Sequence, residues 1–402
     1  MTQPALERAT HTGMNLSVAT NFDDEMLRRI SSYPVEEIYG KLPRDFVGGG
    51  RASYSTGDVG KSGLESHIRL AHSLGIRFNY LLNASCLGNR EWSRHGYREI
   101  RRLLDYLVQV GVDSVTVSMP YLAEVIKKHY PRFLLKIGIF ANIDSPIRAR
   151  FWEDLGADSI VLESFSLNRS FALLGAIREK VSCKLQLIAN FLCLPNCPMQ
   201  VSHMNGISHG SNTEDTTPFI DYCIFKCSSM TLKDPSLLIK SRWIRPEDLS
   251  FYEARGFHSF KLLERNAPTD TLVKRVAAYA ARTSPDNLME LIQPFGFKKE
   301  VRKEFGWYWS LLKERPGLVF SLYKLLKLRG MLFPLQNNPI SLDSHKIPAN
   351  FLDEISRRPC AAVNDCRDCG YCRSISDAAY RVDETYRDEC LRWYKTVFRK
   401  LC

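Results

Sequence analysis

Short apolar segments alternate with longer segments whose apolar residues recur at helical spacing, and this pattern continues through most of the chain. The short segments predict eight strands, at residues 14–20, 37–40, 77–82, 114–118, 134–140, 159–162, 184–189 and 259–263. The longer segments predict intervening helices, which include residues 64–74, 97–110, 122–129, 147–155, 171–180 and 246–254. A glycine repeatedly separates a predicted helix from the strand that follows it.

Strands that alternate with helices indicate parallel pairing, and eight such units predict an α/β fold of the (β/α)8 TIM-like barrel type. A doubly wound open sheet is the competing architecture. It is disfavoured because no glycine fingerprint for a dinucleotide follows the first strand. We therefore expect a barrel, followed by a C-terminal helical extension that is rich in cysteine.

The chain divides into four predicted regions. Residues 1–13 are expected to be disordered, and residues 14–285 form the barrel, with a cysteine-containing loop at 190–227. Residues 286–350 are a basic amphipathic helical segment and linker, and residues 351–402 are a cysteine-cluster tail. We expect the basic helices to pack on the barrel or on each other. The alternatives are that they lie on a membrane surface or that they bind an acidic partner.

Charge and cysteine usage narrow the cellular setting. The chain has 402 residues, a net charge of +11 and a pI of about 9.0, which suits RNA, a membrane surface or a small anion as well as an ordinary basic protein. Twelve cysteines are too sparse for a disulfide scaffold, and their clustering indicates metal binding in a reducing compartment. The polar N-terminus does not resemble a signal peptide, and no apolar run is long enough to span a bilayer. We expect a cytoplasmic protein.

Polar residues stand where the predicted strands end, and the carboxyl ends of the strands form the active face of such a barrel. We expect these side chains to bind substrate or transfer protons, although each taken alone is also a common turn residue. The candidates are Asn83, Asn142, Glu163, Glu264 and Arg265.

Two C-x3-C pairs flank a polar segment after the seventh strand. The pairs are Cys193 with Cys197 and Cys223 with Cys227, and the segment between them contains His203 and His209. Four thiolates suit an iron–sulfur cluster or a tetrahedral zinc ion, whereas unpaired cysteines are also common core residues. The histidines are candidate acid–base groups or solvated loop residues.

The tail carries a second, denser cysteine group. Its members are Cys360, Cys366, Cys369 and Cys372, with Cys390 or Cys402 as an alternative to Cys360. The tight C-x2-C spacing is typical of iron–sulfur ligation and equally of zinc sites. The sequence therefore predicts a second metal centre, either an iron–sulfur cluster or zinc.

Three segments resemble one known family. They are residues 81–83, residues 140–142 with 150–156, and residues 257–265. In this order, with four cysteines between the last two strands, they resemble peptidase family U32, the collagenase-like proteins, over about residues 14–270. The resemblance implies the oxygen-independent hydroxylase branch, which includes the anaerobic ubiquinone-biosynthesis hydroxylases and RNA hydroxylation proteins.

The resemblance also implies a [4Fe-4S] cluster on Cys193, Cys197, Cys223 and Cys227, and for some members an anionic donor such as prephenate. The chain departs from the familiar pattern in two respects, because both pairs are C-x3-C and because the tail cysteine group is additional.

We expect an iron–sulfur redox enzyme that hydroxylates an aromatic metabolite, a biosynthetic intermediate or an RNA base. A peptidase is the first alternative, with Cys86 as a candidate nucleophile, although the chain has neither a His-Glu-x-x-His motif nor a Gly-x-Ser-x-Gly motif. A radical S-adenosylmethionine enzyme would need a third cysteine that is missing after Cys197. A non-enzymatic metal-binding or scaffold role is the remaining alternative. An electron-transfer partner and a homo- or hetero-oligomer are both compatible with the sequence.

Overall fold

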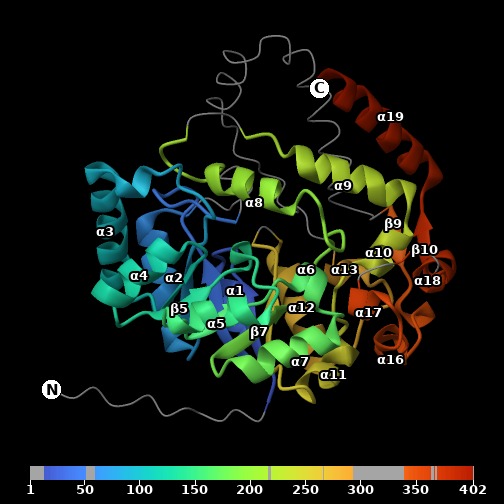
Figure 1. Cartoon of the computed structure of the whole chain (residues 1–402), viewed down its shortest axis with the longest axis horizontal. Coiled ribbons are helices and arrows are strands. Elements are labelled where there is room, and N and C mark those ends of the chain that lie inside the picture. Colours follow the sequence, from blue (N-terminus) through green and yellow to red (C-terminus); the bar gives the residue numbers. More distant parts are fainter. Residues whose placement is uncertain are drawn as a thin grey trace.

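Eight parallel strands close into a barrel in sequence order (Figure 1). The computed structural model describes residues 13–50, 59–215, 219–265, 267–292, 339–363, 366 and 369–401. The barrel closes where β8 pairs in parallel with β1. The strands are β1 (Asn15–Ala19), β2 (Val35–Gly40), β3 (Arg77–Leu82), β4 (Ser114–Val117), β5 (Leu134–Ile137), β6 (Ser159–Val161), β7 (Lys184–Ile188) and β8 (Ser259–Leu262). The predicted (β/α)8 barrel is therefore confirmed.

Helices surround the barrel and begin and end where local chemistry favours it. Pro120 and Pro146 occupy the first turns of α4 and α5, where a missing N–H costs nothing. Gly156, with a φ of +93°, follows α5 in a conformation that other residues adopt only with strain. The helices of the outer layer are α1 (Asp24–Ile30), α2 (Lys61–Ser73), α3 (Arg94–Gln109), α4 (Pro120–His129), α5 (Pro146–Asp154), α6 (Ser164–Leu167), α7 (Phe171–Lys180), α11 (Leu249–Glu253) and α12 (Thr269–Ala281).

The connection between β7 and β8 is largely helical, which corrects the prediction of a loop at 190–227. It contains α8 (Gln200–His209), α9 (Tyr222–Lys233) and α10 (Ser236–Lys240). Figure 1 shows α8 and α9 lying across one end of the barrel. His203, His209 and the second cysteine pair are thus held on helices.

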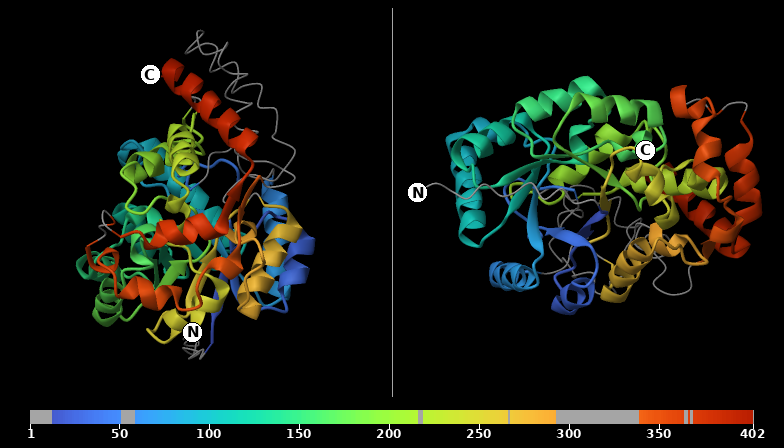
Figure 2. Two further views of the ribbon diagram at one scale, coloured as in Figure 1. Left: turned by 90° about the vertical axis from the view of Figure 1, so that its right-hand side faces the viewer. Right: turned by 90° about the horizontal axis from the view of Figure 1, so that it is seen from below.

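The tail packs directly against the barrel. It is preceded by α13 (Met289–Ile292) and β9 (Ile340–Leu342). The tail itself contains α16 (Phe351–Ser356), α17 (Cys360–Val363), α18 (Tyr371–Ala379), β10 (Tyr380–Val382) and α19 (Glu384–Leu401). Phe351 stacks on Trp243 with a ring-centroid distance of 5.7 Å. Helix α19 contacts α9, and the tail lies along one side of the barrel (Figures 1 and 2). Tail residues such as Phe351 and Ile375 belong to the same apolar core as the barrel strands.

Part of the predicted basic helical segment and linker at 286–350 is folded. Strand β9 pairs antiparallel with β10, so residues 340–342 are joined to the tail. The predicted disordered N-terminus, apart from residue 13, and residues 293–338 of the predicted basic helical segment and linker lie outside the described residues. Within the described ranges, no helix combines the length and the apolar character needed to cross a membrane.

A buried charged group lies inside the barrel. Glu37 on β2 pairs with Lys136 on β5 and accepts a 2.7 Å hydrogen bond from the Ser17 hydroxyl. Burial alone would raise the pKa of Glu37, but Lys136, Lys261 and Ser17 lower it to about 2. The pair therefore stabilises the fold above the ordinary carboxyl pKa of about 4.3, and this stabilisation is lost as the pH falls towards 2.

We predict that Glu37→Gln lowers the free energy of unfolding by about 3–5 kcal/mol at pH 7, because it leaves the Lys136 ammonium buried without a carboxylate. The difference from the unmodified protein should narrow as the pH falls below about 4. Urea unfolding at several pH values measures both effects. Glu65→Gln, which breaks the exposed Glu65–Arg69 pair, is the control and should change stability by less than about 1 kcal/mol. A pH-independent loss for Glu37→Gln would contradict the assignment.

Candidate functional site

A cavity of about 310 Å³ opens at the carboxyl ends of the barrel strands, beneath α8 and α9. Its walls are mainly apolar, with Phe165 and Phe191 in edge-to-face contact at a centroid distance of 4.8 Å. A few polar side chains converge on it from separate strand ends, as is usual in ligand sites. The polar lining includes Asn83, Gln200, His203, Asp221, Lys261, Glu264 and Arg265.

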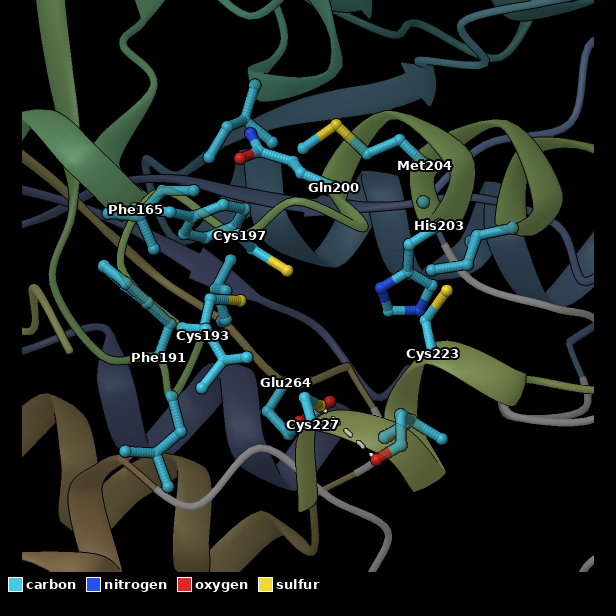
Figure 3. Close-up of a pocket in the computed structure, with 18 of the residues that line it drawn as sticks. Phe165, Phe191, Cys193, Cys197, Gln200, His203, Met204, Cys223, Cys227 and Glu264 are labelled. Atoms are coloured by element: carbon cyan, nitrogen blue, oxygen red, sulfur yellow. Dashed lines mark hydrogen bonds between the residues drawn. The ribbon is translucent and has the colours of Figure 1, made fainter. Parts of the chain in front are cut away.

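All four cysteines of the two C-x3-C pairs line this cavity (Figure 3). Cys193 and Cys197 come from the segment after β7, and Cys223 and Cys227 lie one turn apart on α9. Burial raises the pKa of the Cys227 thiol to about 12, with further contributions from Asp221 and Cys197. Burial, Asp221 and Cys197 also raise the pKa of the Cys223 thiol. Cys197 therefore lies near both thiols of α9.

The donor set is one that both iron–sulfur clusters and zinc sites use, because four thiolates suit either. A zinc ion needs its donors at about 2.0–2.3 Å from one point. Among the described residues, no three His, Cys, Asp or Glu side chains converge in that way. The four thiols line one space together with apolar rings (Figure 3).

Gln200, at the start of α8, connects two of the predicted site residues. Its side-chain amide donates to Asn142 Oδ1 at 2.9 Å and to Glu163 Oε1 at 2.8 Å. Burial raises the pKa of Glu163, although Gln200 and Ser166 counteract this by hydrogen bonding. Gln200 lines the cavity, whereas Asn142 and Glu163 lie behind it and position it.

The two predicted histidines have different surroundings. His203 lines the cavity, and its Nε2 lies 3.0 Å from Asp221 Oδ1. His209 lies outside the cavity lining and pairs through Nδ1 with Asp215 at 2.6 Å. Asp215 also accepts a hydrogen bond from Arg90 at 3.0 Å, so His209 belongs to a structural hydrogen-bonded group with Asp215 and Arg90. His203 is therefore the histidine that can reach a bound molecule.

The remaining predicted residues reach the cavity from two loops. The Asn83 side-chain oxygen accepts a 3.1 Å hydrogen bond from Gly50 N, which brings the glycine loop at 48–50 to the cavity rim. Glu264 and Arg265 follow β8 and are almost fully buried. Glu264 has a φ of +99°, a backbone conformation that side chains adopt only with strain, and such strain is often found at functional sites.

Lys261 is a cavity residue that the sequence reasoning did not select. It lies in the middle of β8, is 7% exposed, and its ammonium lies 3.8 Å from the centre of the Tyr39 ring. Burial lowers the pKa of Lys261 to about 7, with Glu37 opposing the shift and Lys136 and Arg265 adding to it. The signal in the sequence that could have pointed to Lys261 is that it is a charged residue within a strand whose other side chains are uncharged.

Comparison with known proteins places the chain in a family. The family model for peptidase family U32 matches residues 30–188, which ends at the last residue of β7. The uncharacterized protease MJ1657 of Methanocaldococcus jannaschii is 35% identical over 256 residues, covering 64% of this chain and 75% of that protein. The chain belongs to peptidase family U32. Both cysteine groups lie beyond the segment that the family model matches.

Two further similarities are more limited. The tRNA hydroxylation protein P of Escherichia coli is 24% identical over 136 residues, which is 34% of this chain and 28% of that protein. The solved structure of the U32 peptidase Mk0906 aligns with a TM-score of 0.49 at 22% identity, covering 66% of this chain and 98% of that one.

We predict that the Lys261 amine in the folded protein loses its proton with a midpoint near pH 7. Competitive acetylation across a pH series, read by peptide mass spectrometry, measures this midpoint. The same peptide in the urea-unfolded chain is the control and should titrate near the ordinary lysine value of about 10.4. Glu37→Gln should lower the midpoint further, because Glu37 favours the charged amine. A folded-state midpoint above about 9 would show that the amine is not desolvated as described.

Proposed function

We propose that Cys193, Cys197, Cys223 and Cys227 hold an iron–sulfur cluster in the barrel cavity, and that the protein is a redox enzyme. The observation that carries this proposal is that four thiols from two separate segments line one cavity at the carboxyl face of the barrel. A bound cluster would supply electron transfer or a Lewis acid at this face. The similarity to a protein named for tRNA hydroxylation supports this direction.

The reaction that we propose is oxygen-independent hydroxylation. A hydroxyl group leaves a donor and replaces a hydrogen on a substrate carbon, and the donor takes that hydrogen, so the substrate loses the two electrons that the donor gains. The cavity suits an aromatic substrate, since Phe165 and Phe191 offer ring faces and edges. The substrate classes proposed are an aromatic metabolite, a biosynthetic intermediate or an RNA base.

The chain's own residues would orient these molecules and move protons. Lys261 and Arg265 lie at the cavity wall and suit an anionic donor such as prephenate. His203, held by Asp221, is placed to accept or donate a proton, while Gln200, fixed by Asn142 and Glu163, can hydrogen-bond to a bound molecule. The apolar rings exclude water from the same space.

We predict that anaerobic reconstitution with iron and sulfide gives visible cluster absorbance, and that Cys193→Ser or Cys227→Ser lowers the iron content by about four atoms per chain. Iron and acid-labile sulfide are measured alongside the spectrum. Cys183→Ser is the matched control, because Cys183 lies just before β7, at the opposite end of the strand that leads to Cys193. The control should keep full iron.

An iron content that is equal in the unmodified protein and in the cavity-cysteine variants would overturn the proposal. Peptide cleavage abolished by Cys86→Ala would then support a peptidase, as in the name of the Methanocaldococcus relative. Within the described residues, Cys86 accepts a hydrogen bond from Gly88 N at 3.2 Å and has no histidine partner. A cysteine nucleophile needs such a base or another activating cation.

A further inference from the structure

The four tail cysteines form a second thiol group beside the barrel. Cys360 and Cys372 are buried, and Cys366 and Cys369 are half-buried. The other three act electrostatically on the Cys372 thiol, although no three described His, Cys, Asp or Glu side chains converge on one point in this group or in the cavity. Residues 364, 365, 367 and 368, between these cysteines, lie outside the described part of the chain.

Positive side chains surround this thiol group. Arg358, just before α17, donates a 3.4 Å hydrogen bond to Cys369 Sγ. Lys240 and Arg242, at and after the end of α10, act electrostatically on Cys366, and Arg169 acts in the same way on Cys372. Three of these four cations come from the barrel and its β7–β8 connection, so the charges converge on the tail from outside it.

Arg169 is the most informative of these cations. It is 1% exposed, and its guanidinium donates to the carbonyls of Ile239 at 2.6 Å and Trp243 at 3.2 Å. Its guanidinium carbon lies beside the stacked rings of Trp243 and Phe351, at 4.6 and 4.7 Å from their centres. Its Nε has no hydrogen-bond partner. Within the described residues Arg169 forms no direct ion pair, and Cys372, Tyr252 and Asp248 favour its charged form from a greater distance.

A buried guanidinium without a counter-ion costs several kcal/mol unless negative charge lies nearby. Protonated thiols carry no charge, but metal binding deprotonates them and leaves a net negative centre. A zinc ion or a [4Fe-4S]²⁺ cluster on four thiolates has a net charge of about −2 in either case. The surrounding cations thus complement either metal.

We propose that Cys360, Cys366, Cys369 and Cys372 bind a metal centre through four thiolates, and that Arg169 and Arg358 balance its negative charge. This inference does not depend on a cluster in the barrel cavity. A metal at this position would fix α17 and α18 against α7 and α10. It would also hold the rest of the tail and the paired strand β9, which contribute Tyr386 and Ile340 to the cavity wall.

The first test is metal analysis of the full chain purified without oxygen. Zinc, iron and acid-labile sulfide are measured for the unmodified protein, Cys369→Ser, Cys372→Ser and Cys193→Ser. We expect both tail variants to lose one zinc, or iron together with sulfide, and Cys193→Ser to keep that same metal. The lost element identifies the centre. Tail variants that carry as much zinc and iron as the unmodified protein would overturn the proposal.

The second test isolates the charge balance. Competition with a chelator measures metal affinity in Arg358→Gln and Arg169→Met, and we expect each to weaken binding about 10-fold or more. Arg357→Gln is the matched control, because Arg357 is adjacent to Arg358 but its side chain is 76% exposed. Arg358→Gln removes a partly exposed side chain, so it tests the idea even if Arg169→Met fails to fold. Equal affinities in Arg357→Gln and Arg358→Gln would refute the role of the cations.

If the tail variants lose metal but the cavity holds no iron, the proposal for the tail stands and only the redox proposal for the cavity fails. Iron confined to the cavity, with no metal lost from the tail variants, would do the reverse. The two outcomes are distinguishable because the cavity and tail cysteines are substituted separately in the same full-length protein.

Discussion

The pairing of β8 with β1 is the constraint on which the rest of this structure depends. Asn15 pairs with Ser259 and Val18 with Leu262, and this closes the sheet. Because all eight strands run parallel, closure brings every carboxyl end to one rim. Asn83 and Lys261, which are far apart in sequence, therefore share one cavity, and the β7–β8 connection covers it with α8 and α9.

Charge inside the barrel is unevenly matched, and this shapes the cavity. Glu37 is a single carboxylate that faces two amines, and it forms its direct ion pair with Lys136. Lys261 is left to a cation–π contact with Tyr39, close to Arg265. Asp221 and Glu264 place two carboxylates on the same cavity wall, so cations and carboxylates both face this space.

Sequence periodicity predicted the barrel well because most of its strands are short segments rich in apolar residues. Such segments can be recognised in the sequence without knowing which strand they pair with. It missed α8 because residues 200–209 are mostly polar, and their helix is stabilised by the cavity and by the strand ends beneath it. It missed β9, whose three residues pair with β10 about 40 residues later. The polar rim followed from the fold, but only side-chain packing separates Gln200 and His203, which face the cavity, from His209, which does not.

The two cysteine groups have opposite electrostatic surroundings. Cys223 and Cys227 lie near the Asp221 carboxylate, whereas the tail thiols lie among cations such as Arg169 and Arg358. Adding an electron to a metal centre adds negative charge, which cations stabilise and carboxylates oppose. The cations around the tail thiols therefore favour the negatively charged centre proposed there, whereas the Asp221 carboxylate opposes added negative charge beside Cys223 and Cys227.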